Sequence, residues 1–151
     1  MEDLPGSGDR YPDWIYEKPE SGASELNLHI FGPYRADYED ILKDVASFLR
    51  NNGYTGAKVC SEIPDHDSVE DMTSFEQNWW ESVNFMHWAD AAIFLYLEPH
   101  ESRLNGKSEK GLNSSAFAEL AFWTTFFSER KAGTLVIYEG EMEHRGSLIS
   151  G

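Results

Sequence analysis

The sequence is poor in cysteine, in basic residues and in long apolar runs, and each shortage excludes a class of protein. Cys60 is the only cysteine, so no disulfide can form within the chain, which agrees with a reducing compartment. The longest apolar run, residues 89–97, is interrupted by Asp90 and is about half as long as a membrane-spanning helix. The first residues have neither the positive start nor the apolar stretch of a secretory signal. We therefore expect a cytoplasmic protein without a membrane span.

Basic residues are outnumbered by acidic ones, 12 against 27, which gives a net charge of −15 at pH 7. Such a charge repels phosphate backbones and anionic lipids, and no basic patch offsets it, so we expect no nucleic-acid or membrane partner. The acidic residues are spread along the chain, as in the acidic proteins of salt-loving microbes. The alternative is an ordinary acidic soluble protein.

The length of 151 residues suits one domain, and 40 % hydrophobic and 14 % aromatic residues predict a packed core. Residues 1–25 are rich in proline, glycine, serine and charge, which is typical of a poorly ordered lead-in. We expect residues 26–151 to form a single α/β domain.

The hydrophobic pattern predicts alternating strands and helices. Strands are expected at residues 26–31, 57–60, 91–97 and 134–138, and helices at residues 37–51, 68–88 and 114–130. Asp37 stands where it can cap the first helix. The fully apolar residues 91–97 indicate a strand covered on both faces.

This order of elements predicts a three-layer Rossmann- or flavodoxin-like fold, with a central parallel sheet of four to five strands. The sequence does not account for the fifth strand and last helix that are usual in such folds. The domain is therefore expected to be either minimal or shortened.

In open α/β sheets, ligands bind beyond the carboxyl ends of the strands, here between the first and third strands. Two loops border that place, residues 32–35 and residues 98–115. Gly32 allows a close backbone approach, the following helix offers free amides, and Arg35 can clamp a phosphate. The alternative is that Gly32-Pro33 only marks a turn and Arg35 is a solvated charge.

Glu119 is the only charged residue between positions 112 and 128. A helix that is apolar on all sides is expected to be largely buried, so this carboxylate should lie desolvated and open toward the crevice. Isolated buried acids are costly unless they serve a function. The alternative is a carboxylate that only favours the positive end of the helix dipole.

Three segments together resemble the nucleoside 2-deoxyribosyltransferase-like N-glycosidases, a superfamily that includes deoxynucleotide N-hydrolases. They are Phe31-Gly-Pro-Tyr34, the helix end at residues 85–90 that leads into residues 91–96, and Asn113-Ser-Ser-Ala-Phe-Ala-Glu-Leu-Ala121. The last segment is similar to a family pattern of Asp-Ser-Gly followed by Glu-Leu-Gly. The resemblance covers roughly residues 26–140.

The resemblance implies that Glu119 attacks the anomeric carbon of a nucleoside or nucleotide and releases the base, as a carboxylate does in retaining glycosidases. It also implies a homo-oligomer and no cofactor. The implied substrate contacts come from Gly32, Pro33, Tyr34, Arg35, Asp90, Asn113 and Ser115. Two positions depart from the family pattern, because Asn113 and Ser82 stand where acids are usual.

The same scaffold has two other interpretations. One is a nucleotide-binding module without catalysis, which Asn113 and Ser82 favour. The other is a TIR-like signalling domain, whose NAD-cleaving members also carry a glutamate after a serine-containing segment. We expect no metal site, since residues 65–67 (Asp-His-Asp) match no established ligand spacing and suit a solvated loop better. His100, in the long loop, is a weaker candidate for a general acid.

Overall fold

The computed structural model describes residues 26–35, 37–63 and 70–140. The expected lead-in at residues 1–25 and the Asp-His-Asp segment lie outside the described residues. Among the described residues, no helix has both the length and the apolar character that a bilayer crossing requires.

The strands form one parallel sheet, as the sequence predicts. They are β1 (Leu28–Phe31), β2 (Ala57–Val59), β3 (Ala91–Tyr96) and β4 (Gly133–Tyr138). Their order across the sheet is β2-β1-β3-β4, with every neighbouring pair parallel. The strand order therefore reverses between β1 and β3, which is where the sequence places the ligand crevice.

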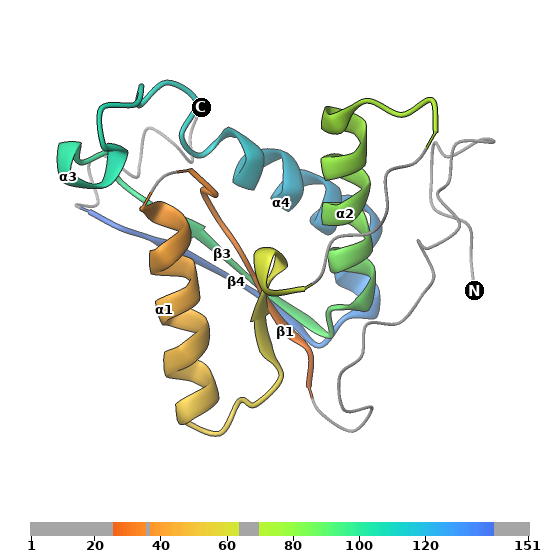
Figure 1. Ribbon diagram of the computed structural model, residues 1–151. Coiled ribbons are helices and arrows are strands. Elements are labelled where there is room, and N and C mark those ends of the chain that lie inside the picture. Colours follow the sequence, from red (N-terminus) through yellow and green to blue (C-terminus); the bar gives the residue numbers. More distant parts are fainter. Residues whose placement is uncertain (1–25, 36, 64–69, 141–151) are drawn as a thin grey trace.

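The helices cover both faces of the sheet, which confirms the three-layer α/β architecture (Figure 1). The longer ones are α1 (Tyr38–Asn51), α2 (Ser74–Trp88) and α4 (Ser114–Phe126). Shorter turns lie between them, namely α3 (Glu101–Leu104) and the 3-10 turns η3 (Cys60–Glu62) and η4 (Ser128–Arg130). Helix α1 packs on one face, and α2 and α4 pack on the other.

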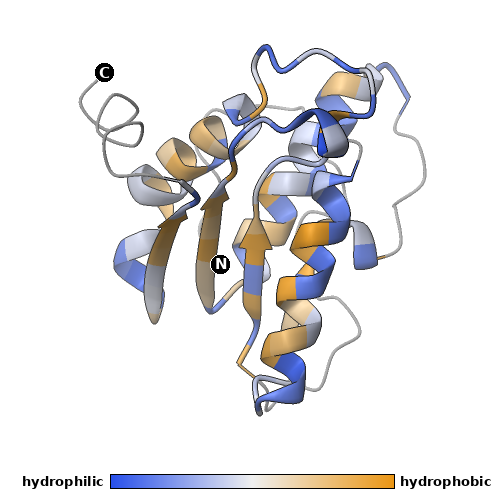
Figure 2. Ribbon diagram, turned by 90° about the vertical axis from the view of Figure 1, so that its left-hand side faces the viewer, coloured by the Kyte–Doolittle hydropathy of each residue, from blue (hydrophilic) through white to orange (hydrophobic). Residues whose placement is uncertain are grey.

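Alternating side chains of β3 pack into two hydrophobic clusters, one on each face of the sheet. Ile93 and Leu95 face α1, where they meet Leu42, whereas Phe94 faces α2 and α4, where it meets Trp123. The strand is buried along almost its whole length, as predicted, and the strands carry much of the hydrophobic colour in Figure 2. The carboxyl end of β3 is thereby held rigidly between two layers.

Helix α2 begins later than the sequence predicts, at Ser74 instead of about residue 68. Thr73 provides the start signal, because its side-chain oxygen accepts a hydrogen bond from the Glu76 amide at 3.1 Å. Phe75, in this first turn, is 82 % exposed although its spacing with Trp79 and Val83 predicts that it belongs to the apolar stripe of the helix. Asp37 occupies the predicted capping position of α1, but its side chain makes no capping bond.

One other expectation needs correction. Helix α4 is not largely buried, since Ala116, Glu119 and Trp123 are its only buried residues and Phe117 and Phe126 are exposed. It lies on the sheet by one side, so its apolar composition did not predict burial all round. The long loop at residues 98–112 contains the short helix α3.

Strand β4 is the edge of the sheet next to β3, and two of its apolar side chains are exposed, Leu135 at 53 % and Ile137 at 43 %. They lie on the α1 face, level with Ile93 and Leu95. Helix α1 packs over β1 and β2 and does not cover them. The expected homo-oligomer remains a prediction.

Candidate functional site

The candidate site lies where β1 and β3 end and α4 begins. The turn after β1 starts at Gly32, and β3 is followed by Leu97. The side chain of Asn113, just before α4, bridges the backbone of Leu97, accepting from its N–H at 3.1 Å and donating to its carbonyl at 2.9 Å. This bridge fixes the start of α4 against the end of β3.

Glu119 lies one turn into α4, and its side chain points into the core. The residue is 2 % exposed, and neither carboxylate oxygen has a hydrogen-bond partner among the described residues. Burial raises the pKa of Glu119 to about 8, and Ser82 of α2 opposes part of that rise. The carboxyl group is therefore mostly protonated at pH 7, because the influence of Ser82 offsets only part of the cost of burial.

Two tyrosines from different elements lie within electrostatic range of Glu119. Burial raises the pKa of Tyr34, in the turn after β1, well above its usual range, and Glu119 adds to the rise. Burial also raises the pKa of Tyr96, the last residue of β3, to about 12, with contributions from Tyr138 and Glu119. Both hydroxyls therefore stay protonated at neutral pH; that of Tyr34 donates to the Ile30 carbonyl at 3.4 Å, whereas that of Tyr96 has no partner among the described residues.

Few buried side-chain polar atoms lack a hydrogen-bond partner among the described residues. The two Glu119 oxygens and the Tyr96 hydroxyl make up most of them, and the others are Asn84 Oδ1 and Trp88 Nε1 of α2. Because an unpaired buried carboxyl group is costly and rare, Glu119 is the strongest candidate in the described part of the chain for meeting a polar ligand.

Packing alone explains why a glycine stands at position 32. A β-carbon there would lie 2.7 Å from Leu42 Cδ2 and 3.2 Å from the Leu95 carbonyl oxygen. The close approach that the sequence predicted is thus an approach to α1 and β3. Pro33 is buried beside it, so these two residues shape the turn that carries Tyr34.

Arg35 holds a neighbouring loop. One guanidinium nitrogen donates to the carbonyls of Ser108 and Lys110, at 2.7 and 3.1 Å. Two amides at the start of α1 are engaged as well, because Asp37 N–H donates to the Arg103 carbonyl and Tyr38 N–H to the Arg35 carbonyl. The predicted anion site is therefore not assembled by these groups.

The predicted substrate residues on α4 have different surroundings. Both polar ends of the Asn113 amide are occupied by Leu97, so the side chain has a structural task. Ser115 is exposed at the start of the helix, one turn before buried Glu119, and makes no hydrogen bond to its carboxyl group. The structure brings Tyr34 toward Glu119 but does not place Ser115 against the carboxyl group.

Asp90 lies at the opposite edge of the sheet, which corrects its expected place in the site. It directly precedes β3. Its carboxylate accepts a hydrogen bond from the backbone N–H of Asn27 at 2.8 Å, and its backbone carbonyl accepts one from the N–H of Ala132. A residue before a parallel strand lies at the amino edge, whereas ligands bind at the carboxyl edge. Asp90 therefore joins strand starts together.

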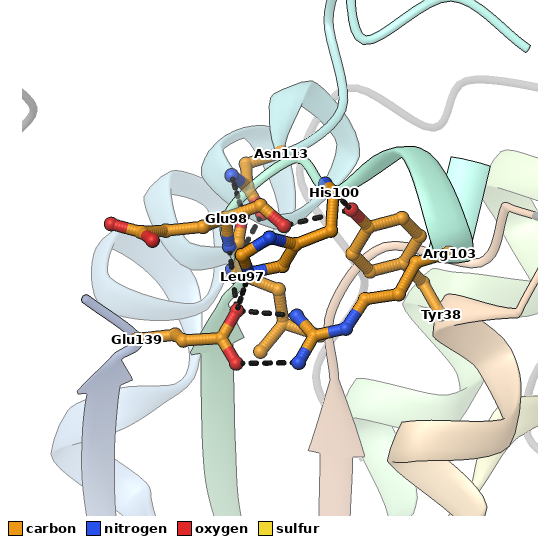
Figure 3. A network of polar contacts seen from close by, with 7 residues as sticks. All are labelled: Tyr38, Leu97, Glu98, His100, Arg103, Asn113 and Glu139. Carbon is orange, nitrogen blue, oxygen red and sulfur yellow. Dashed lines mark hydrogen bonds and ion pairs between the residues drawn. The ribbon is translucent and has the colours of Figure 1, made fainter.

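A polar network also occupies the carboxyl edge, on the α1 side of the sheet (Figure 3). Arg103 of α3 pairs through both terminal nitrogens with the carboxylate of Glu139, which follows β4. This pairing lowers the pKa of Glu139. His100 has its ring nitrogen 3.9 Å from Glu139, and its backbone N–H donates to the Tyr38 hydroxyl. The network ties α3 to β4, and His100 belongs to it.

Metal binding has no assembled centre in the described part of the chain, where no group of three or more His, Cys, Asp or Glu stands together. The residues that sequence reasoning undervalued are Ser82 and Tyr96. Ser82 was noted only as a departure from a family pattern, yet it is the side chain that acts on Glu119 from α2. Tyr96 ends an apolar run, and a hydroxyl at that position was an available signal.

Comparisons with known proteins add no relative: no family model matches the chain, and neither curated proteins nor solved structures give a significant match.

Proposed function

We propose that this protein is an N-glycosidase or deoxyribosyltransferase that cleaves the C–N bond between a sugar and a base in nucleosides or nucleotides, with Glu119 as nucleophile. One observation supports the proposal above all others. Glu119 is buried without a hydrogen-bond partner among the described residues, yet it lies near Tyr34 at the carboxyl edge of the sheet. The sequence resemblance at residues 113–121 supports the same role.

The chemistry follows from the carboxyl group. An ionised Glu119 oxygen bonds to the anomeric carbon as the C–N bond breaks, and the electron pair of that bond leaves with the base, which takes up a proton. Water, or a second base, then attacks the same carbon and frees the carboxylate. Low dielectric surroundings strengthen the interaction between the carboxylate and the positive charge that develops on the sugar.

Tyr34 and Ser82 complete the proposed reaction centre. Both residues carry a neutral hydroxyl group. The charge of Glu119 contributes to the raised pKa of Tyr34, and Ser82 lowers the pKa of Glu119. Hydrogen bonds from such groups to an ionised carboxylate favour its charged form. Asp90 is not part of this centre, because its carboxylate is engaged with Asn27 at the other edge.

A second candidate is a nucleotide-binding module without catalysis, including a TIR-like signalling module. The observation that favours it is that Arg35 and Asn113, which were expected to hold substrate, are engaged with backbone groups of the protein itself. A neutral carboxyl at pH 7 also binds ligands as a hydrogen-bond donor. This candidate predicts binding without bond cleavage.

The two candidates are separated by incubating the protein with a panel of nucleosides, deoxynucleotides and NAD, at high and low salt, and measuring free base by chromatography. We expect base release by the wild type, with a loss of at least about a thousandfold in Glu119→Gln. Because the nucleophile must be ionised, kcat/KM should rise with pH through about 8, the pKa of Glu119.

Asp90→Asn is the control, since it removes an exposed carboxylate charge at the opposite edge of the sheet without touching the proposed centre. It should keep base release within a few fold of the wild type once its folding is checked by circular dichroism. Tight ligand binding without release, unchanged in Glu119→Gln, would contradict the enzymatic proposal and favour the binding module.

A further inference from the structure

Helix α4 presents an uncharged face at the surface of a strongly acidic protein. Its only charged residue, Glu119, is buried, so the exposed side of the helix carries no charge. The other two long helices differ, because α1 exposes Asp40 and Asp44 and α2 exposes part of Glu76. On a chain with a net charge of −15, an uncharged helix face is where another molecule can approach with the least repulsion.

Aromatic side chains extend this face from α4 onto α2. The ring of Phe122 on α4 has its centroid 4.7 Å from that of Phe126 and 5.3 Å from that of Trp79 on α2. Phe75, which is 82 % exposed, lies one helical turn before Trp79. Helices α2 and α4 pack on the same face of the sheet (Figure 1), so these rings form one apolar patch across both helices.

The exposed side of α4 combines small and large side chains. Ala118, Ala121 and Thr125 are exposed at helical spacing, and the partly exposed rings of Phe117 and Phe126 flank them on either side. Short side chains leave room for a second helix to come close, and rings beside them fill the space that short side chains of the partner leave. Because one face supplies both, it is complementary to a copy of itself under two-fold symmetry.

We infer that this face of α2 and α4 joins two copies of the chain in a symmetric dimer. Each copy carries a charge of −15, and at this face neither brings a charged side chain of α4 toward the other. The 13 residues of α4 make the face about 20 Å long, and two packed helices make it about 20 Å wide. Such a face is at the small end of specific interfaces, so we expect a Kd in the micromolar range. The inference does not depend on the proposed function, because its test measures association alone.

The test is sedimentation equilibrium of the full chain at low and high salt. Salt screens the repulsion between two acidic molecules and leaves an apolar contact in place. We therefore expect the Kd of the dimer to fall at least about tenfold when NaCl is raised from about 50 mM to about 1 M. An interface made of ion pairs would weaken under the same change.

Substitutions at exposed positions locate the interface. Ala121→Glu places two like charges at the centre of the dimer, so the Kd at high salt should rise at least about tenfold. Phe75→Glu, on the α2 part of the face, should raise it by a smaller factor. Phe48→Glu is the matched control, because it makes the same change at a phenylalanine of α1 that is 64 % exposed. It should leave the Kd within about twofold of the wild type.

Three results would overturn the inference. One is a wild type that stays monomeric at every salt concentration, which would assign the face to another partner. The second is a dimer that Ala121→Glu and Phe75→Glu leave intact; if Leu135→Glu dissociates it, the interface lies at β4 instead. The third is equal weakening by Ala121→Glu and Phe48→Glu, which would show a general effect of charge. Circular dichroism checks the folding of each variant, and Phe75→Glu decides the point if Ala121→Glu does not fold.

Discussion

Among the described residues, one histidine and one glutamate are buried and neutral at pH 7, and they differ in how they are partnered. His29 of β1 is 1 % exposed, donates from Nδ1 to the Phe85 carbonyl at 2.8 Å and stacks on the Phe85 ring at 3.9 Å. Glu119 is as deeply buried, but neither oxygen has a partner in the described residues. Burial alone therefore does not distinguish these two side chains, whereas their hydrogen bonding does.

The same difference separates the two edges of the sheet. At the amino edge, Asn27 pairs with Asp90, and the Lys131 ammonium donates to the His87 carbonyl at 2.7 Å. At the carboxyl edge, the hydroxyl of Tyr96 and the carboxyl of Glu119 are left open. The carboxyl edge also carries paired groups, such as Arg103 with Glu139, so the unpaired Glu119 stands out within it, and we propose that it serves a ligand.

The substitution His29→Ala tests first whether His29 serves stability and not function. The substitution removes a buried ring, its stacking contact with Phe85 and one hydrogen bond. We therefore expect the free energy of unfolding to fall by about 3 kcal/mol. Urea unfolding followed by circular dichroism measures the loss. Base release per folded molecule should stay near the wild-type value, and a large selective loss of activity would assign His29 a functional role instead.

Acidification should reveal a smaller effect of His29 on the free energy of unfolding. Burial lowers the pKa of His29 from 6.5 to about 3, so below pH 6.5 the unfolded chain takes up a proton that the folded chain does not. The stabilising contribution of neutral His29 is therefore lost as the pH falls from 6.5 toward 3, by at most about 1.4 kcal/mol per pH unit.

The matched variant is His29→Gln, which can still donate a hydrogen bond but does not titrate. The difference in unfolding free energy between wild type and this variant should shrink when measured at pH 7, 6 and 5. A constant difference would show that the imidazole titrates alike in the folded and unfolded states.

Much of the fold follows from local pattern. The apolar residues 91–97 predicted β3 because a fully covered parallel strand has no polar face, and a single acid in an apolar helix predicted that Glu119 is buried. The exposed side of α4 was not predictable from composition, because exposure depends on which other elements pack against the helix.

The surroundings of the site were harder to predict, since they join distant segments. Ser82 and Glu119 meet only when α2 and α4 pack on one face. The pairing of Arg35 with Ser108 and Lys110 likewise depends on how a loop folds back. Asp90 is different, because a residue directly before a strand belongs to the amino edge, and that signal was present in the sequence.

The most direct test of the central claim is the unfolding free energy of wild type and Glu119→Gln as a function of pH. The pKa of Glu119 is about 8 in the folded protein and near 4.5 when unfolded, so between these values the unfolded chain loses a proton that the folded chain keeps. Folding of the wild type must therefore weaken as the pH rises through this range.

Glutamine cannot titrate, and all other groups cancel in the comparison. We predict that Glu119→Gln gains stability relative to wild type from about pH 5 to pH 8, by on the order of 1 kcal/mol per pH unit, and that the difference then levels off. A difference independent of pH would contradict the account, because it would mean that the carboxyl group is solvated or paired and not held in readiness for a ligand.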